Sequence, residues 1–313
     1  MRTKLLVFIV MLVGSSAFGG SGYTNNATWL AYGYGHAANP DAIRETASRM
    51  RKDFAVSYWF LNCGLLSSTG QIGDPPARLA TFLDTLRNWE QENGYRFTVL
   101  AMINGHTTKL DLGDPTVCSN IVAEAKRFVM MPGRAFDGVQ LDLEPAGGSP
   151  QRFEQINRLI TEIKAAIPGK LTSFAAPKIG ATQWSWPTEH FVAMATNVDL
   201  LAVMTYDSGL TNGVEYADWV RDHTVKALQA VRGTTAKILI GFPAYPNNRW
   251  HTNTAENVSF AAAGVKAALK ELPATANFLG AAVYVHADGT GADGRAGYET
   301  DWRWFKESWL DSW

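Results

Sequence analysis

Scarce cysteine and short apolar runs limit what this 313-residue chain can be. Its two cysteines, Cys63 and Cys118, are too few for a disulfide-rich scaffold or a cysteine-based zinc site. The sequence leaves open whether they form a disulfide bond or stay free thiols. Beyond the first residues, no apolar stretch approaches the roughly 20 residues that span a bilayer. We therefore expect a globular protein with no membrane span.

The chain also lacks an excess of either charge. Lys and Arg total 28 and Asp and Glu total 29, which gives a formal net charge of −1. A nucleic-acid-binding domain would show a basic excess, so no nucleic-acid partner is expected. No H-E-x-x-H, zinc or EF-hand spacing is present, and we predict no metal site. The absence of a G-x-S-x-G elbow argues against a serine hydrolase.

The first residues have the features of a secretory signal. Arg2 and Lys4 carry positive charge, residues 5–13 are apolar, and residues 14–17 are small. A retained membrane anchor is the alternative, but nine apolar residues are too few to cross a bilayer. We predict a signal peptide at 1–17, a mature domain at 18–313, and a secreted or periplasmic location.

Strand-like runs alternate with helical periodicity along the rest of the chain. The predicted strands are 28–34, 55–61, 97–104, 139–144, 171–176, 198–206, 238–242 and 278–285, and a helical segment follows each of them. Such alternation requires a parallel sheet, and eight units fit a single (β/α)8 barrel, the TIM barrel, without a sizeable insertion domain. The rival open sheet usually carries a glycine-rich phosphate loop; here residues 33–36 lack its third glycine.

Residues 136–145, F-D-G-V-Q-L-D-L-E-P, carry the strongest functional signal. In a strand, Gln140, Asp142 and Glu144 share one face, with the Cα atoms of the two acids about 6.7 Å apart. A solvent-facing edge strand would show the same alternation, but a closed barrel has no edge. Barrel active sites form where the strands end, so we expect Asp142 and Glu144 at that mouth.

The chemistry that fits two carboxylates at a barrel mouth is glycoside hydrolysis. Neighbours on one strand are poorly placed to flank a bond as acid and opposing base. One acid and one orienting carboxylate fit better, with the nucleophile supplied by the substrate. Eleven Trp residues include candidates for stacking on sugar rings.

Three motifs carry a resemblance to a known family. D-G-V-Q-L-D-L-E at 137–144 resembles the D-G-x-D-x-D-x-E signature of glycoside hydrolase family 18, which includes chitinases and endo-β-N-acetylglucosaminidases. M-T-Y-D at 204–207 is similar to the family's M-x-Y-D, and G-F-P-A-Y at 241–245 to its G-x-P-x-Y. The motifs follow the family's order on the expected strands.

The resemblance implies a role for each matching residue. Glu144 would be the general acid and then the base, Asp142 would hold the acetamido N–H of the −1 sugar, and Tyr206 would bind the acetamido oxygen. That oxygen would attack C1, giving an oxazolinium intermediate and a retained anomer without any cofactor. The further predicted substrate contacts are Gln140, Met204, Asp207, Tyr245 and Tyr284.

The resemblance also implies the partner and leaves an alternative. The expected partner is a chitin-like, peptidoglycan or N-glycan chain that contains N-acetylglucosamine, bound by a monomer. A non-catalytic glycan-binding protein on the same barrel is the alternative, although such members usually lose the acid at Glu144. An unrelated barrel hydrolase is the third possibility. With only about 30 residues between Tyr245 and the last strand, an open cleft and endo-type cleavage are expected.

Three departures from the family pattern mark a divergent branch. Gln140 replaces the middle aspartate, Asn104 and Gly105 stand where S-x-G-G is usual, and Tyr284 stands where many members have Trp. The loss of charge at Gln140 removes a repulsive neighbour of Asp142. Asp142 should therefore ionise more easily than it would beside an aspartate.

The first prediction concerns this neutral position. In Gln140→Asp, the added carboxylate should hinder ionisation of Asp142, so the acid limb of the pH–activity profile should move to higher pH. The measurement is kcat against pH for both proteins. An unmoved acid limb would contradict this account.

Overall fold

Eight parallel strands close into a barrel. The computed structural model describes residues 25–31, 33–36, 39–73, 79–272, 276–286 and 298–313, so the predicted signal segment lies outside the described residues. The barrel strands are β1 (Asn26–Leu30), β2 (Val56–Leu65), β3 (Thr98–His106), β4 (Gly138–Glu144), β5 (Leu171–Ile179), β7 (Leu200–Met204), β8 (Lys237–Pro243) and β9 (Phe278–His286). Each pairs with its neighbour in this order, and β9 pairs with β1. The predicted TIM barrel is confirmed.

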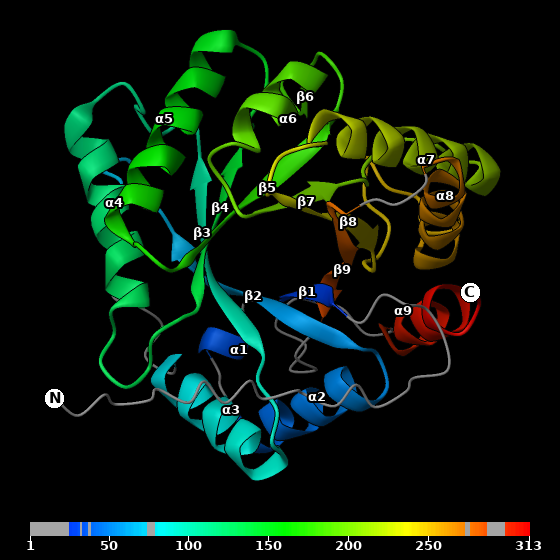
Figure 1. Cartoon of the computed structure of the whole chain (residues 1–313), viewed down its shortest axis with the longest axis horizontal. Helices are drawn as coiled ribbons and strands as arrows, with labels where there is room; N and C mark the ends of the chain where they lie inside the picture. The colour runs from blue at the N-terminus through cyan, green and yellow to red at the C-terminus, as the bar shows by residue number, and fades with distance from the viewer. Residues whose placement is uncertain (1–24, 32, 37–38, 74–78, 273–275, 287–297) are drawn as a thin grey trace, which may run out of the picture.

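Helices surround these strands (Figure 1). They are α1 (Gly33–His36), α2 (Pro40–Lys52), α3 (Leu79–Asn93), α4 (Pro115–Val129), α5 (Pro150–Ala166), α6 (Thr188–Met194), α7 (Gly213–Ala230), α8 (Val258–Glu271) and α9 (Tyr298–Phe305), which runs into a π-helical turn, η1 (Lys306–Leu310). α5 begins at a typical N-cap: Ser149 Oγ accepts a hydrogen bond from Arg152 N at 3.1 Å, and Pro150 takes the first helical position.

Asn26 ties the two ends of the described chain together at the seam of the barrel. Its Oδ1 accepts hydrogen bonds from Ala281 N on β9 at 3.0 Å and from Trp309 Nε1 in η1 at 2.9 Å. Its Nδ2 donates to the carbonyl of Ala55 at 3.3 Å. Because Asn26 is fully buried, these bonds fix β1, β9 and the C-terminal turn to one another without help from water.

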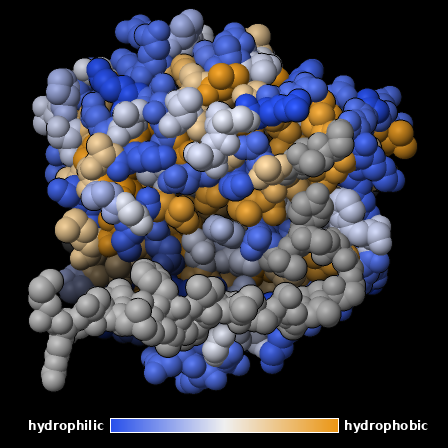
Figure 2. All heavy atoms as spheres, in the orientation of Figure 1, coloured by the Kyte–Doolittle hydropathy of each residue, from blue (hydrophilic) through white to orange (hydrophobic). Residues whose placement is uncertain are grey.

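The strands are buried along most of their length, as expected for a parallel barrel covered by helices. Large aromatic side chains fill the layer between strands and helices, among them Trp59, Trp186, Trp302 and Trp309. Most of the eleven Trp residues are therefore core residues. On the face seen in Figure 2, hydrophilic residues make up most of the rim and hydrophobic ones lie mainly toward the middle.

Several details differ from the sequence prediction. The first strand ends at Leu30 and is followed by α1, and the strand predicted at 198–206 ends at Met204. There the chain turns, since Thr205 N donates to Val203 O at 3.0 Å.

Between β8 and β9, the described residues contain α8 and no insertion domain. Cys63 and Cys118 are both buried and free. Within the described part of the chain, no helix is long and apolar enough to cross a membrane.

The second prediction tests the seam. Asn26→Ala would remove the buried hydrogen bonds that the Trp309 indole and the Ala281 amide donate to Oδ1, which should lower the free energy of unfolding by about 2 to 4 kcal/mol. Urea unfolding followed by tryptophan fluorescence measures the change. Gln91→Ala on the exposed side of α3 is the control, expected within about 0.5 kcal/mol of wild type. Equal stability of the two variants would contradict the role of Asn26.

Candidate active site

Gln140, Asp142 and Glu144 rise in steps along β4 toward the carboxyl end of the barrel. Gln140 is fully buried. Its Oε1 accepts a hydrogen bond from Trp29 Nε1 at 2.8 Å, and its Nε2 donates to Ser173 Oγ at 3.1 Å. Its donor and acceptor groups are engaged inside the barrel, where they connect β4 to β1 and β5 beneath the two acids. The contact of Gln140 with substrate stays a prediction.

Asp142 holds a buried acceptor with no partner. No group among the described residues makes a hydrogen bond to its Oδ1 atom. Burial, followed by repulsion from Glu144, raises the pKa of Asp142 well above its usual value. A buried carboxylate oxygen without a hydrogen-bond donor is unfavourable. A ligand N–H that reached Oδ1 would remove that penalty.

Glu144 ends β4 and lies among charged groups. Burial and the negative charge of Asp207 raise its pKa, while Lys178 opposes the shift. Its side chain makes no hydrogen bond to any other residue that the structure describes. A carboxyl group that holds its proton at higher pH and is free to turn toward a ligand has the properties of a general acid.

Three tyrosines form an aromatic wall beside the acids. Tyr206 stacks on Tyr284, with ring centroids 5.3 Å apart, and Tyr245 meets both rings edge-on at 5.8 and 5.6 Å. Trp29 continues the wall, 5.7 Å from Tyr284. Burial raises the pKa of Tyr206 well above its usual value, so its phenol stays a hydrogen-bond donor.

Gly241, the first residue of G-x-P-x-Y, makes room for this wall. A Cβ atom at this position would lie 2.7 Å from the carbonyl oxygen of Val203 and 3.0 Å from the ring of Tyr206. Any larger residue would therefore push Tyr206 out of place. Met204, the last residue of β7, is half-buried and pairs in register with Pro177 of β5.

Asp207 is held in an uncommon backbone conformation by its neighbours. Its φ of +53° lies in the left-handed region, which non-glycine residues seldom adopt. Tyr245 Oη donates to its Oδ1 at 2.9 Å, and Asn248 Nδ2 at 3.4 Å. From the other side, Lys178 Nζ donates to the carbonyl oxygens of Tyr206 and Asp207. These bonds over-determine the turn, which is the condition for strained residues to persist.

Lys178 is a functional candidate that the sequence prediction missed. It follows Pro177 near the end of β5, and its charge acts on Glu144, Asp207 and Glu256. Burial lowers its pKa, while those three acids counter the shift. The sequence did contain a signal that could have identified Lys178, namely a charged residue at the carboxyl end of a barrel strand.

Glu256 was missed as well, and it braces the loop after β7. Its Oε1 accepts hydrogen bonds from Ser208 N at 2.9 Å, Ser208 Oγ at 2.6 Å and Gly209 N at 3.0 Å. The two ring nitrogens of His251 face the Glu256 carboxylate at 3.4 Å and the Tyr245 carbonyl at 3.1 Å. Glu256 lies between β8 and α8, outside any strand or helix, so the periodicity of the sequence did not identify it as a functional residue.

The predicted residues therefore meet from distant parts of the sequence. β4 supplies Asp142 and Glu144, the turn after β7 supplies Tyr206 and Asp207, and Tyr284 comes from β9. Within the described ranges, no group of three or more His, Cys, Asp or Glu residues is arranged to hold a metal ion.

The third prediction follows from the unpartnered acid. Asp142→Asn removes a buried charge and should raise the free energy of unfolding at pH 7.5 by about 1 kcal/mol or more. In wild type, the raised pKa makes the folded state bind more protons than the unfolded state above pH 3.8, so stability falls as pH rises toward the folded-state pKa.

The advantage of Asp142→Asn should therefore shrink toward pH 4, close to the unfolded-state pKa of 3.8, where little of the difference in proton binding has accumulated. Urea unfolding at the two pH values measures it, with the exposed Asp311→Asn as the charge-matched control. A gain that is the same at both pH values would show that burial of charge is not its cause.

Comparison with known structures identifies similar barrels. The group IV chitinase of Ostrinia furnacalis shares 14% identity with a TM-score of 0.59, over 91% of this chain and 98% of that one. A chitinase from Chromobacterium violaceum ATCC 12472 shares 17%, with a TM-score of 0.58 over 90% and 98%. The Bacillus cereus spore cortex-lytic enzyme SleL shares 13%, with a TM-score of 0.58 over 92% and 75%. At these identities the likeness concerns the fold.

The sequence profile gives the family. No curated protein matches the chain significantly. The profile of glycosyl hydrolases family 18, however, matches residues 24–307, which include every barrel strand and the whole candidate site. The chain belongs to family 18 of the glycosyl hydrolases.

Proposed function

We propose that the protein is a secreted or periplasmic glycosidase that cleaves β-linked glycans containing N-acetylglucosamine by a retaining, substrate-assisted mechanism. The observation that carries the proposal is the pair on β4. Asp142 presents a buried acceptor without a partner, and two residues along the strand Glu144 has a raised pKa. The two acids differ in surroundings, which suits two different roles.

In the first step, Asp142 accepts a hydrogen bond from the 2-acetamido N–H of the sugar at the cleavage point. The acetamido oxygen is thereby turned toward C1 and forms a bond to it as the glycosidic C–O bond breaks. Glu144 gives its proton to the departing oxygen. Tyr206, kept protonated by burial, donates toward the acetamido oxygen. The products are the released alcohol, an oxazolinium ion and the Glu144 carboxylate.

In the second step, the same groups act in reverse. The Glu144 carboxylate removes a proton from water as the water oxygen attacks C1, and the bond between C1 and the acetamido oxygen breaks. Two displacements at C1 retain the anomeric configuration. Between the steps Glu144 is anionic, and the positive charge of Lys178 stabilises it there. Lys178 is thus a positioning residue that acts on Glu144 and on the turn at Asp207.

The proposed substrate class rests on family membership together with the nature of the relatives. The similar structures above are named as chitinases and as a spore cortex-lytic enzyme, and the Ostrinia furnacalis chitinase has been solved with allosamidin. Tyr284, which is half-buried and packs on Tyr206 and Tyr245, offers ring surface for a sugar. Export would follow from the predicted signal peptide at 1–17.

A non-catalytic glycan-binding protein is the second candidate, and one observation favours it. Gln140 has no acidic group, and its amide is committed to Trp29 and Ser173. It therefore cannot share a proton with Asp142 as a second carboxylate could. In this alternative, Asp142 and the tyrosines would bind the acetamido sugar without cleaving it.

The fourth prediction separates the two candidates. Wild type and Glu144→Gln are each incubated with chitooligosaccharides, peptidoglycan and a high-mannose glycopeptide. Wild type should cleave at least one of these, and the variant should lose activity by about 10²- to 10⁴-fold because it cannot supply the proton. Binding should survive, since Gln preserves the size of the side chain. Released sugars are quantified by mass spectrometry, and binding by calorimetry.

Two results would overturn the enzyme assignment. Binding of a glycan by wild type without cleavage of any of the three would indicate the glycan-binding alternative. A thiazoline analogue of the oxazolinium ion should inhibit competitively. Cleavage that this analogue leaves untouched would argue against substrate assistance.

A further inference from the structure

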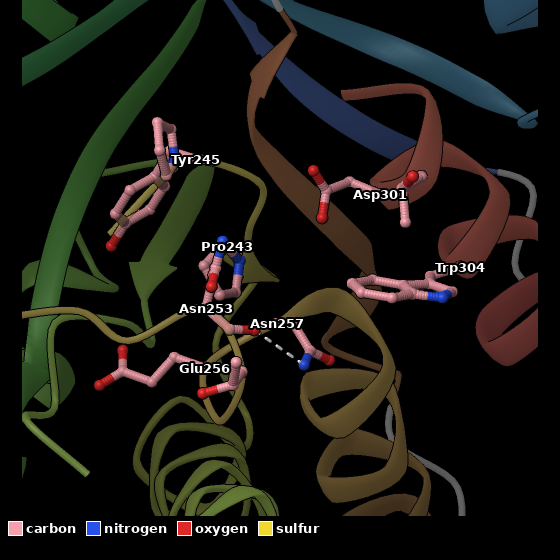
Figure 3. Close-up of a pocket in the computed structure, with 10 residues that line it drawn as sticks. Pro243, Tyr245, Asn253, Glu256, Asn257, Asp301 and Trp304 are labelled. Atoms are coloured by element: carbon pink, nitrogen blue, oxygen red, sulfur yellow. Dashed lines mark hydrogen bonds between the residues drawn. The ribbon is translucent and has the colours of Figure 1, made fainter. Parts of the chain in front are cut away.

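A second pocket lies beside the candidate active site, on the other side of Tyr245. It has a volume of about 500 Å³ and lies between the end of β8, the loop that follows it, the start of α8, and α9 (Figure 3). The lining residues are Pro243, Tyr245, Pro246, Asn253, Thr254, Glu256, Asn257, Thr300, Asp301 and Trp304. None of them is among the acids on β4, so the pocket is separate from the proposed site of bond cleavage.

Asp301 and Trp304 form the α9 side of this pocket. They are three residues apart, which puts them on one face of the helix. In Figure 3 the Asp301 carboxylate points from α9 into the pocket, and the Trp304 ring extends beneath it. Pro243, Asn253 and Tyr245 lie across from them. One wall therefore combines a carboxylate with an aromatic surface.

The polar groups of the pocket fall into two classes. Asn257 and Glu256 are used by the protein: Asn257 caps α8 and donates to the Asn253 carbonyl, and Glu256 binds Ser208 and His251. The side chains of Asn253, Thr254, Thr300 and Asp301, by contrast, have no hydrogen-bond or ion-pair partner among the residues described here. Four unengaged polar groups therefore face one half-enclosed space.

The charge balance singles out Asp301. Glu256 and Tyr245 are the other titratable groups that line the pocket, and His251 lies behind them. The Glu256 carboxylate faces His251 Nδ1 at 3.4 Å and accepts hydrogen bonds from Ser208, whereas Asp301 has no ion-pair partner among the described residues. Burial raises the pKa of Asp301 to about 6, with His251 opposing the shift. At neutral pH it is an ionised carboxylate in a poorly solvated position.

A ligand that satisfies this pocket needs three properties. A positive charge would pair with Asp301, and a cation near the indole of Trp304 would gain further from the ring. An apolar ring face would pack on Trp304 and the two prolines. Hydroxyl groups would bind Asn253 and Thr254. A pyranose with a free amine has all three, whereas an N-acetylated sugar lacks the charge.

We propose that this pocket is an accessory binding site for a glucosamine unit, that is, for a de-N-acetylated residue of a glycan chain. Asp301 pairs with the ammonium group, Trp304 packs against the ring, and Asn253 and Thr254 bind hydroxyls. The site would hold partly deacetylated glycans beside the catalytic mouth. This extends the proposed function but does not depend on it, because binding here needs neither Asp142 nor Glu144.

The fifth prediction tests the site directly. The ligands are the β-1,4-linked disaccharide of glucosamine and its di-N-acetylated counterpart, at pH 7. The protein is the Glu144→Gln variant, in which cleavage is blocked. The glucosamine disaccharide should shift the indole N–H signal of Trp304 in a ¹⁵N-correlated NMR spectrum and bind there about tenfold more tightly than the acetylated one. Loss of that signal in Trp304→Phe provides its assignment.

Asp301→Asn, added to the same background, should abolish the preference between the two disaccharides. Asp311→Asn removes an exposed carboxylate of the same C-terminal segment and should leave the preference unchanged. Thermal unfolding of each variant checks that the fold is intact. Failure of the proposed function would appear as no cleavage by wild type, and it would leave these shifts in place.

Three outcomes would overturn the proposal. No shift of the Trp304 signal would show that the pocket does not bind the sugar. Equal affinity for the two disaccharides would make it a neutral carbohydrate site. A preference that survives Asp301→Asn would mean that another group recognises the amine.

Discussion

Closure of the barrel between β1 and β9 is the constraint on which the site depends. In a closed parallel barrel, all strands end at one rim, so residues far apart in the sequence are brought together there. Glu144 and Tyr284 are separated by three barrel strands of the chain, yet both lie around Tyr206. Asn26 holds the seam and also fixes the C-terminal turn. The second pocket depends on the same closure, because α9 supplies one of its walls.

The candidate site is organised to bind a ligand, at a cost in folding stability. Asp142 lacks a donor, burial raises the pKa values of both β4 acids, and Asp207 has a left-handed backbone. These features oppose stability one by one, and the surrounding structure over-determines them. Gln140 fixes the base of the strand, and Lys178 fixes the turn. Stability lost at such a site is regained where a ligand supplies the missing donor and displaces water.

The sequence predicted the fold well because the determining pattern is local. Alternation of apolar runs and helical segments identified all eight barrel strands, and period-two alternation put Asp142 and Glu144 on one face. Strand ends were less predictable: Tyr206 lies beyond β7, in a turn made by Thr205. The role of Gln140 depends on Trp29 and Ser173, which no local pattern reveals. Lys178 and Glu256 likewise act through contacts with distant loops, so only the folded chain indicates them.

Tyr245 links the two sites physically. Its hydroxyl group binds Asp207 on the catalytic side, while its ring lines the second pocket and lies 4.0 Å from His251. His251 in turn contacts Glu256, which holds the loop after Tyr206 and Asp207. A ligand in the pocket would thus contact Tyr245, whose hydroxyl group positions Asp207. Coupling between the sites requires that such a ligand favour one arrangement of this loop over another. Tyr245 and Glu256 form the wall that the two sites share, so the ligand's contacts with them would differ between the two loop arrangements.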